Sequence, residues 1–135
     1  MKIDGFCHCG YITYEAEVDP EKISICHCAD CQTLSGAPFR ASVAVAAADF
    51  RFLTGEPATY VKTADSGNRR AQTFCPKCGS PIYSANADDS DAPRALRLGG
   101  IRQRDSLVPR RQIWGRSRQR WVDDLGAIER LDGQA

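Results

Sequence analysis

Seven cysteines in three short clusters limit what this chain can fold into more than any other feature of its sequence. The clusters are Cys7-His8-Cys9, Cys26-His27-Cys28-Ala29-Asp30-Cys31 and Cys75-Pro76-Lys77-Cys78. An odd number of cysteines cannot all pair as disulfides. In a reducing compartment, closely spaced cysteines are typical of metal ligands or catalytic groups. The spacing therefore predicts metal sites rather than a disulfide framework.

The length and the terminal residues favour one zinc-binding domain over residues 1–135 in the cytoplasm. A chain of 135 residues, 42% of them hydrophobic, is long enough to bury a modest core. No apolar run approaches the roughly 18 residues of a membrane span, so we expect no membrane contact. The first residues lack the pattern of a signal peptide, which favours a cytoplasmic location with reduced thiols.

Short alternating segments predict a mostly β domain with antiparallel strands and little helix. Residues 11–18 alternate apolar and polar side chains, which places Ile12, Tyr14, Ala16 and Val18 on one face. Further strands are expected at 23–26, 39–46, 58–63, 71–74, 82–85 and 95–99, with turns between them at 54–57, 66–68 and 86–93. A short helix is expected at 29–35, ended by Gly36, and a second helix is a candidate near 124–131.

The first and third clusters together predict a closed zinc site. Zinc takes four ligands at tetrahedral corners, and a closed set of thiolates marks a structural ion. Cys75-Pro76-Lys77-Cys78-Gly79 has the spacing of a zinc knuckle, in which glycine tolerates a positive φ. Cys7 and Cys9 are two residues apart, so on a strand both side chains leave the same face. We expect Cys7, Cys9, Cys75 and Cys78 to hold the structural zinc.

The second cluster predicts a zinc site with an open position. Cys26, Cys28 and Cys31 supply three thiolates, and no other cysteine remains. Three protein ligands and a free fourth position are characteristic of catalytic zinc. Two Zn²⁺ ions are therefore expected. The expectation for the second site includes partial occupancy by the metal.

Several alternatives to this division stay open at the level of sequence. His8 or His27 would close the second site if it were a ligand, although on a strand each would point away from the metal. Asp30 could also ligate, but an aspartate beside a turn commonly caps a helix. Another pairing would join Cys28 and Cys31 to the third cluster. The cysteines could also be buried apolar residues, or hold iron in a rubredoxin-like site.

The three clusters resemble those of the glutathione-dependent formaldehyde-activating enzyme and centromere-protein-V-like family. The similar motifs are Gly5-Phe6-Cys7-His8-Cys9-Gly10, then Cys26-His27-Cys28-Ala29-Asp30-Cys31 with Gly36-Ala37-Pro38-Phe39, then Phe74-Cys75-Pro76-Lys77-Cys78-Gly79. They occur in family order, and the likeness spans about 5–121. The resemblance implies a β-tent of two small antiparallel sheets, with the structural zinc on the first and third clusters and the catalytic zinc on the second.

The resemblance also implies a carbon–sulfur lyase reaction, run in the direction that joins glutathione to formaldehyde. A free thiol has a pKa near 8.5, and coordination to zinc deprotonates it. Small thiol and aldehyde substrates, with glutathione as the candidate thiol, are therefore the expected partners. If residues 114–121 form a strand, Arg116, Arg118 and Arg120 share the face of Trp114 and could bind substrate carboxylates. The other interpretation is a solvated face, with Trp114 and Trp121 at the core or an edge.

The alternative function is a non-catalytic zinc module that contacts nucleic acid or a protein through its arginine-rich C-terminal part. Nine arginines lie between Arg94 and Arg120, with Asp105 as the only acid among them. Phosphate binding needs such clustered positive charge. The formal net charge is only +1, however, so nucleic-acid binding is disfavoured. The sequence carries no prediction of oligomeric state.

Overall fold

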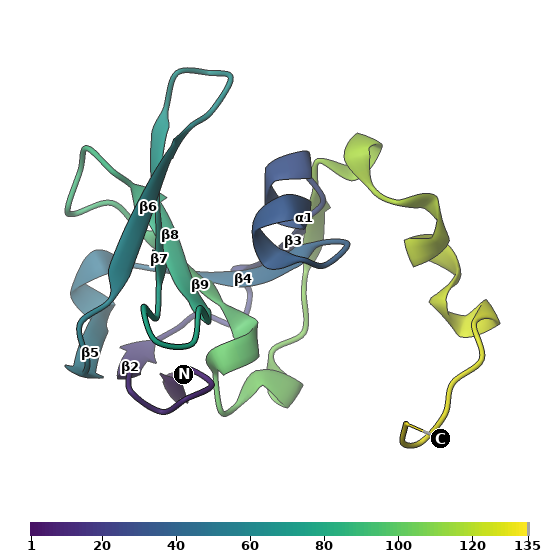
Figure 1. Ribbon diagram of the computed structural model, residues 1–135, viewed down its shortest axis with the longest axis horizontal. Coiled ribbons are helices and arrows are strands. Elements are labelled where there is room, and N and C mark those ends of the chain that lie inside the picture. The colour runs from purple at the N-terminus through teal and green to yellow at the C-terminus, as the bar shows by residue number, and fades with distance from the viewer. Residues whose placement is uncertain (135) are drawn as a thin grey trace.

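The computed structural model describes residues 1–134, in which the strands form two sheets (Figure 1). The smaller sheet has the order β1-β2-β5 and is antiparallel throughout. Its strands are β1 (Lys2–Phe6), β2 (Thr13–Glu17) and β5 (Phe50–Thr54). The prediction of a mostly β protein built from two sheets is confirmed.

The larger sheet has the order β10-β3-β4-β9-β8-β7-β6 and is antiparallel except for the pair β10–β3. Its strands are β3 (Ile23–Cys26), β4 (Arg40–Val45), β6 (Ala58–Thr63), β7 (Arg69–Phe74), β8 (Pro81–Asn86), β9 (Arg94–Arg97) and β10 (Arg111–Ile113). With seven strands and one parallel pair, this sheet is larger and less uniform than the two small antiparallel sheets expected.

The core lies between the two sheets and contains the face predicted from residues 11–18. Ile12, Tyr14, Ala16 and Val18 are all buried, as the alternating pattern predicts. Val43 and Leu96, which are register partners on β4 and β9 of the larger sheet, are buried in the same cluster. The ring of Tyr14 packs against the ring of Phe50 on β5, and the two ring centroids are 5.5 Å apart.

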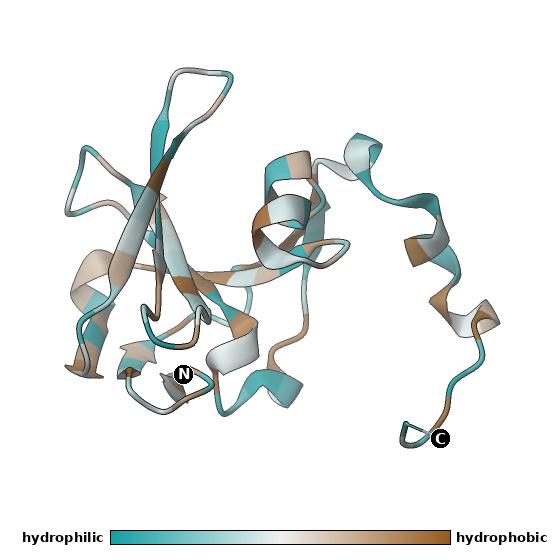
Figure 2. Ribbon diagram, viewed as in Figure 1, coloured by the Kyte–Doolittle hydropathy of each residue, from teal (hydrophilic) through white to brown (hydrophobic). Residues whose placement is uncertain are grey.

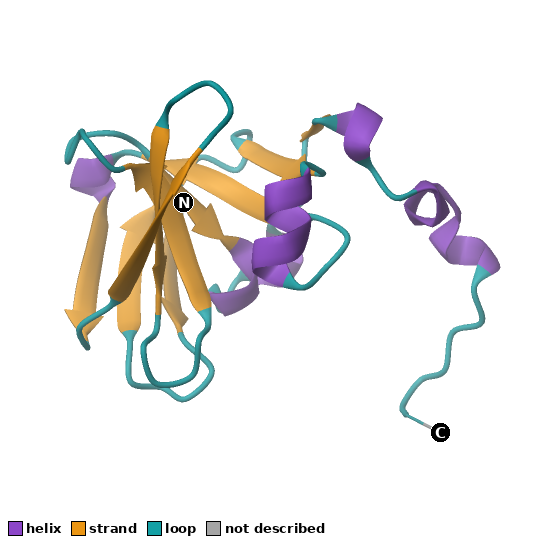
Figure 3. Cartoon of the chain, turned by 45° about the horizontal axis from the view of Figure 1, so that its top comes forward, coloured by secondary structure: helices purple, strands orange, loops and turns teal. Residues whose placement is uncertain are grey.

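The one α-helix of residues 1–134 is α1 (Ala29–Ser35), and its bounds are those predicted. Cys28 caps its N-terminus, where the Sγ accepts a hydrogen bond from the backbone amide of Cys31. Gly36 ends the helix in the left-handed region with φ of 64°, which glycine adopts without steric strain. Figure 3 shows α1 beside the larger sheet, between that sheet and the C-terminal segment.

Within residues 1–134, five short 3₁₀ segments lie outside the strands, three of them between strands and two after β10. They are Ala47–Asp49, Leu98–Gly100, Arg104–Ser106, Gly115–Ser117 and Arg120–Ala127. The last of these begins four residues before the expected helix near 124–131, and Asp124 interrupts it with non-helical dihedrals. After β10 the chain leaves the two sheets, and its apolar residues alternate with polar ones in an exposed arm (Figures 1 and 2).

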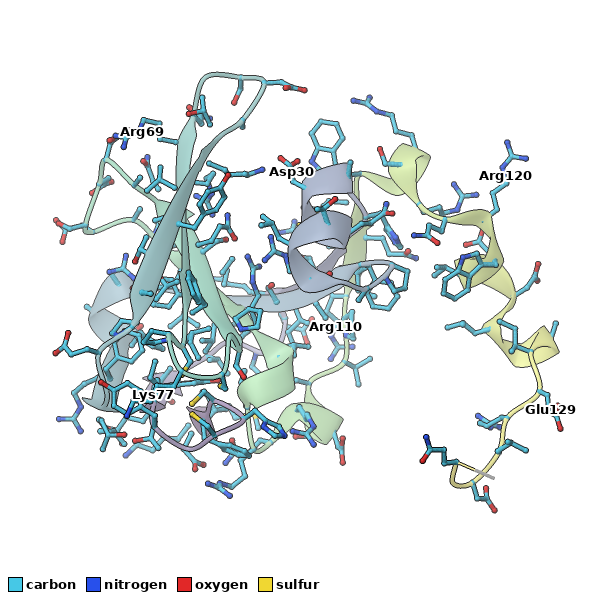
Figure 4. All side chains as sticks on the ribbon, viewed as in Figure 1. Asp30, Arg69, Lys77, Arg110, Arg120 and Glu129 are labelled. Carbon is cyan, nitrogen blue, oxygen red and sulfur yellow. The ribbon has the colours of Figure 1, made fainter. Side chains whose placement is uncertain are left out.

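The expected strand at 114–121 is wrong. Trp114 takes a positive φ of 55°, which turns the chain out of the extended conformation directly after β10. Arg116 lies over the ring of Trp114 at 4.6 Å, whereas Arg118 pairs with Asp123 at 2.9 Å. Both tryptophans are about half exposed, so neither belongs to the core. The three arginines therefore do not form one carboxylate-binding face, and Figure 4 shows Arg120 pointing away from the body of the protein.

Among residues 1–134, the helices are all too short or too polar to cross a bilayer.

Candidate metal centres

The first and third cysteine clusters meet in space, with the ligand atoms of Cys7, Cys9, Cys75 and Cys78 all within 4.8 Å of one another. The Sγ atoms of Cys7 and Cys9 are 3.6 Å apart, and those of Cys9 and Cys75 are 3.8 Å apart. Four thiolates about 2.3 Å from a tetrahedral zinc stand about 3.8 Å from one another. The sulfur spacing therefore fits a four-thiolate zinc site.

Two tight turns bring these sulfurs together. Cys7 and Cys9 lie in a turn after β1, closed by a 3.0 Å bond from the Gly10 amide to the Cys7 carbonyl, and not on a strand as expected. The second turn follows β7, where the Gly79 amide donates to the Cys75 carbonyl at 2.8 Å. Gly79 has a φ of 80°, as the knuckle pattern predicts.

The backbone around this site favours ionised sulfur. The Ile12 amide donates to Cys7 Sγ at 3.2 Å, and the Lys77 amide lies 3.4 Å from Cys75 Sγ. Hydrogen bonds from Ser80 lower the pKa of Cys78 to about 5. Hydrogen bonds to a thiolate stabilise its charged form, which is the form that binds a metal.

The second cluster forms a separate group of three sulfurs, with the ligand atoms of Cys26, Cys28 and Cys31 within 4.8 Å of one another. Cys26 ends β3, Cys28 caps α1 and Cys31 lies in the first turn of that helix. In Figure 4 Asp30 on α1 and Lys77 in the turn after β7 lie far apart, so the two clusters are distinct sites. The alternative in which Cys28 and Cys31 join the third cluster is not the arrangement of this structure.

Burial and a neighbouring guanidinium act in opposite directions on this cluster. Burial raises the pKa of Cys26 to about 12, and the neighbouring cysteines add to the shift. Burial also opposes ionisation of Cys31, but a hydrogen bond from Arg40 and its positive charge outweigh it, so the pKa of Cys31 lies below its usual value. Arg40 is the register partner of Cys26 across the pair β3–β4. A cation therefore stands beside a cluster of potential thiolates.

Within the described residues, neither metal-ligand group includes a histidine or an acid. His27 is fully buried, and its Nε2 lies 2.6 Å from Gln112 Oε1. His8 is exposed, and Asp30 is engaged by Lys62, with 2.6 Å between Oδ2 and Nζ. These three residues do not complete the second cluster.

A pocket of about 560 Å³ lies between the two clusters. His8 and Ser80 line it next to the four-cysteine group, and Ser35 and Arg40 line it next to the three-cysteine group. The rest of its lining is Phe6, Phe39, Ala41, Pro81, Arg97, Gly99, Gly100 and Arg104. Arg40 and Arg97 were not predicted as site residues. The available signal was a single charged residue within each of two largely apolar predicted strands, 39–46 and 95–99.

Two of the pocket arginines meet at one amide oxygen. Gln72 Oε1 accepts from Arg40 Nη2 and from Arg97 Nη2, each at 3.3 Å. Arg97 Nη1 also donates to Ser42 Oγ at 2.7 Å. Burial and the nearby charge of Arg40 lower the pKa of Arg97 to about 10, because both disfavour its charged form. The guanidiniums of Arg40 and Arg97 thus lie together in a partly desolvated environment.

Comparison with known proteins gives one family match. Residues 2–117 match the model of the family described as glutathione-dependent formaldehyde-activating enzyme, close to the expected span of 5–121. A crystal structure of a Rhodobacter sphaeroides protein, a structural genomics target, has a similar fold, with a TM-score of 0.58 and 18% sequence identity. The likeness covers 81% of this chain and 98% of that one. No curated protein matches the sequence.

Proposed function

Because the chain belongs to the family of glutathione-dependent formaldehyde-activating enzymes, we propose that it is a zinc-dependent carbon–sulfur lyase. Its reaction joins a thiol such as glutathione to formaldehyde or a related small aldehyde, or runs in reverse. Cys26, Cys28 and Cys31 hold the catalytic zinc, and Cys7, Cys9, Cys75 and Cys78 hold a structural zinc. Two separate groups of sulfurs, each with its ligand atoms within 4.8 Å of one another, support both assignments.

The main support for this proposal is the number of sulfur ligands in the second cluster. Three sulfurs lie together, and no histidine, carboxylate or further cysteine of residues 1–134 joins them. A tetrahedral metal held there keeps one position for a molecule from solution, whereas the four-cysteine group is closed. The division between an open and a closed site is what distinguishes a reactive zinc from a structural one.

Zinc held at the open site would supply a substrate thiol in its ionised form at neutral pH, where only a few per cent of a free thiol with a pKa near 8.5 is ionised. In the reaction a carbon–sulfur bond forms, and the carbonyl π bond breaks. The oxygen then takes up the proton that the thiol released, so the product is a hydroxymethyl thioether. The cap and first turn of α1 orient the cluster, and Phe6 and Phe39 give the neighbouring pocket an apolar wall.

A paired metal count and rate measurement tests this function. We expect two zinc ions in the wild-type protein and one in Cys28→Ser, whose circular dichroism spectrum stays native. The rate of hydroxymethyl-glutathione formation above the uncatalysed rate, followed by NMR, should fall to background in that variant. Ser66→Ala, at an exposed turn, is the control and should match the wild type. A Cys28→Ser protein as active as the wild type would refute the catalytic role of this cluster.

The alternative of a nucleic-acid-binding module gains no support from the arginine-rich stretch. Three of its nine arginines pair with carboxylates, in the ion pairs Arg102–Asp4, Arg110–Glu21 and Arg118–Asp123. Two more, Arg97 and Arg104, line the pocket. A surface that binds phosphates needs unpaired cations on one face.

A further inference from the structure

We propose that the pocket between the two cysteine clusters binds the carboxylate of a small mercapto acid, held by Arg97 and Arg40. This rests on the proposed function, since it names the class of thiol that the reaction takes. The carboxylate lies a few bonds from the sulfur, because the two guanidiniums lie next to the three-cysteine cluster. Arg97 is thereby a residue that determines specificity for an anionic thiol.

The lining of the pocket is positively charged. Three arginines and no acid line the pocket. None of the three takes part in an ion pair among residues 1–134, although seven other cations of that part of the chain do. Cations left without a carboxylate in a cavity attract an anion from solution. The pocket therefore favours a negatively charged occupant.

Two of the pocket arginines have hydrogen-bond donors without acceptors among residues 1–134. Arg40 is only 8% exposed, yet its Nε has no partner, and the Nε of Arg97 is also unpaired. Both guanidiniums donate to one neutral acceptor, Gln72 Oε1, at the long distance of 3.3 Å, and Arg97 Nη1 has a second neutral acceptor in Ser42 Oγ. Buried polar groups are normally satisfied. A planar carboxylate is the acceptor that a guanidinium binds best, through two parallel hydrogen bonds.

The two arginines lie beside the three-cysteine cluster in the larger sheet. Cys26 and Arg40 are register partners on β3 and β4, so their side chains leave the same face of the sheet. Arg97 lies on β9 opposite Ser42, two residues farther along β4. The anion site is thus adjacent to the sulfur cluster, because Arg40 and Cys26 are direct neighbours across two strands. Phe6 and Phe39 in the pocket lining offer an apolar wall for the short alkyl chain.

The positive charge exceeds what the cluster itself needs. Three thiolates around Zn²⁺ carry a net charge of −1, which one guanidinium balances. Arg40 is the one beside Cys31, so the charge of Arg97 is left for the carboxylate, to which Arg40 offers its unpaired Nε. Arg94, on the same strand, provides a contrast: it donates to the carbonyl oxygens of Ala92 and Ser90 and lies over the ring of Tyr83. An unpaired Nε alone does not make a site, since that of Arg94 is unpaired as well.

Calorimetric binding of two matched thiols tests the proposal. The probes are 3-mercaptopropionate and its neutral isostere 3-mercaptopropanamide, titrated into zinc-containing protein without aldehyde. Wild-type protein should bind the acid at least about tenfold more tightly than the amide, the difference that a good charge-assisted contact gives. Arg97→Gln should reduce the ratio to within about twofold, and the control Arg94→Gln should keep it.

Each result bears on the site independently of the reaction. Equal binding of acid and amide by the wild type, or an unchanged preference in Arg97→Gln, overturns the proposal. If Arg97→Gln fails to fold, Arg97→Lys decides instead: it keeps the charge but loses the paired donors, and an undiminished preference would overturn the role of Arg97. Hydroxymethylation of each thiol by formaldehyde is then measured separately. Selective binding without reaction would leave the anion site standing and refute the proposed function.

Discussion

Gly5 on β1 has no room for a side chain, because the ring of Tyr14 on the neighbouring strand lies where a Cβ would be. Tyr14 is 1% exposed, and its burial raises the pKa of the phenol above its usual value. The close approach lets the tyrosine fill the space between the sheets. Gly5 also begins the first cysteine motif of the sequence, so its role there is to admit the aromatic ring.

Replacing Gly5 with alanine should therefore lower the free energy of unfolding by roughly 2–3 kcal/mol, the cost typical of overpacking a core. Urea denaturation of Gly5→Ala beside the wild type measures the change. Gly126→Ala is the matched control, since nothing lies within 4 Å of the Cβ that it would add. Equal stability of Gly5→Ala and wild type would contradict the close approach.

At the level of elements, the free edge of the smaller sheet is covered by the segment after β9. Asp4 of β1 accepts hydrogen bonds from Arg102 Nε at 2.8 Å and from Gln103 Nε2 at 2.7 Å. The backbone amide of Arg102 donates to the Asp4 carbonyl at 2.9 Å. These contacts join residues nearly a hundred positions apart and protect a sheet edge from pairing with other chains.

The Asp4 contacts predict a pH dependence of stability. Hydrogen bonds from Arg102 and Gln103, with the charge of Arg102, lower the pKa of Asp4. A carboxyl whose pKa is lower in the folded state stabilises the fold above its unfolded pKa of about 3.9, and that stabilisation is lost as the pH falls through the folded value. Asp4→Asn should therefore be less stable than wild type at pH 7, and the gap should close below about pH 4. Thermal unfolding across this pH range measures it, and a constant gap would contradict the assignment.

Strands marked by local sequence signals were predictable from sequence. Strands that form only by pairing with a segment far away in the sequence were not. The bounds of β6 and α1 match the prediction, because the turn signals at 54–57 and 66–68 on either side of the one and the glycine stop of the other are local signals. β10 has three exposed residues and no pattern, and it is a strand only because it pairs with β3, some 87 positions earlier in the register. β1 and β5 were missed for a related reason: five-residue strands at the ends of a sheet carry little periodicity.

The same contrast holds for the candidate site. Spacing within each cluster gave the two cysteine groups, because a knuckle is a property of four consecutive residues. The pocket arginines were missed, since Arg40 and Arg97 come together only through the pairing of β4 with β9. The carboxylate site expected on Arg116, Arg118 and Arg120 failed because Trp114 turns the chain.

For the whole molecule, the four-cysteine group joins the two sheets. Cys7 and Cys9 follow β1 of the smaller sheet, whereas Cys75 and Cys78 follow β7 of the larger one. A metal held there would cross-link the sheets at one end of the core. The three-cysteine group, in contrast, lies within a single connection from β3 to α1. The first group therefore bears on global stability and the second on local structure.

Metal loss at the two groups should accordingly have unequal effects. Cys75→Ser is expected to cost roughly 3 kcal/mol or more of folding free energy, because the binding energy of a structural zinc is folding energy. Cys28→Ser should cost less, since it leaves that cross-link intact. Thermal unfolding and zinc counts on both variants compare them. Equal losses of stability, or a larger loss in Cys28→Ser, would contradict the separation of the two roles.

The cross-link between the sheets also has a consequence for synthesis of the chain. Cys9 and Cys75 are 66 positions apart. At about 5–20 residues per second, a ribosome takes several seconds to make the chain between them. During that interval Cys7 and Cys9 are reduced thiols without their partners, whereas Cys26, Cys28 and Cys31 are complete within a fraction of a second. The local cluster is thus the first whose potential metal ligands are complete, and the N-terminal pair waits longest for its partners.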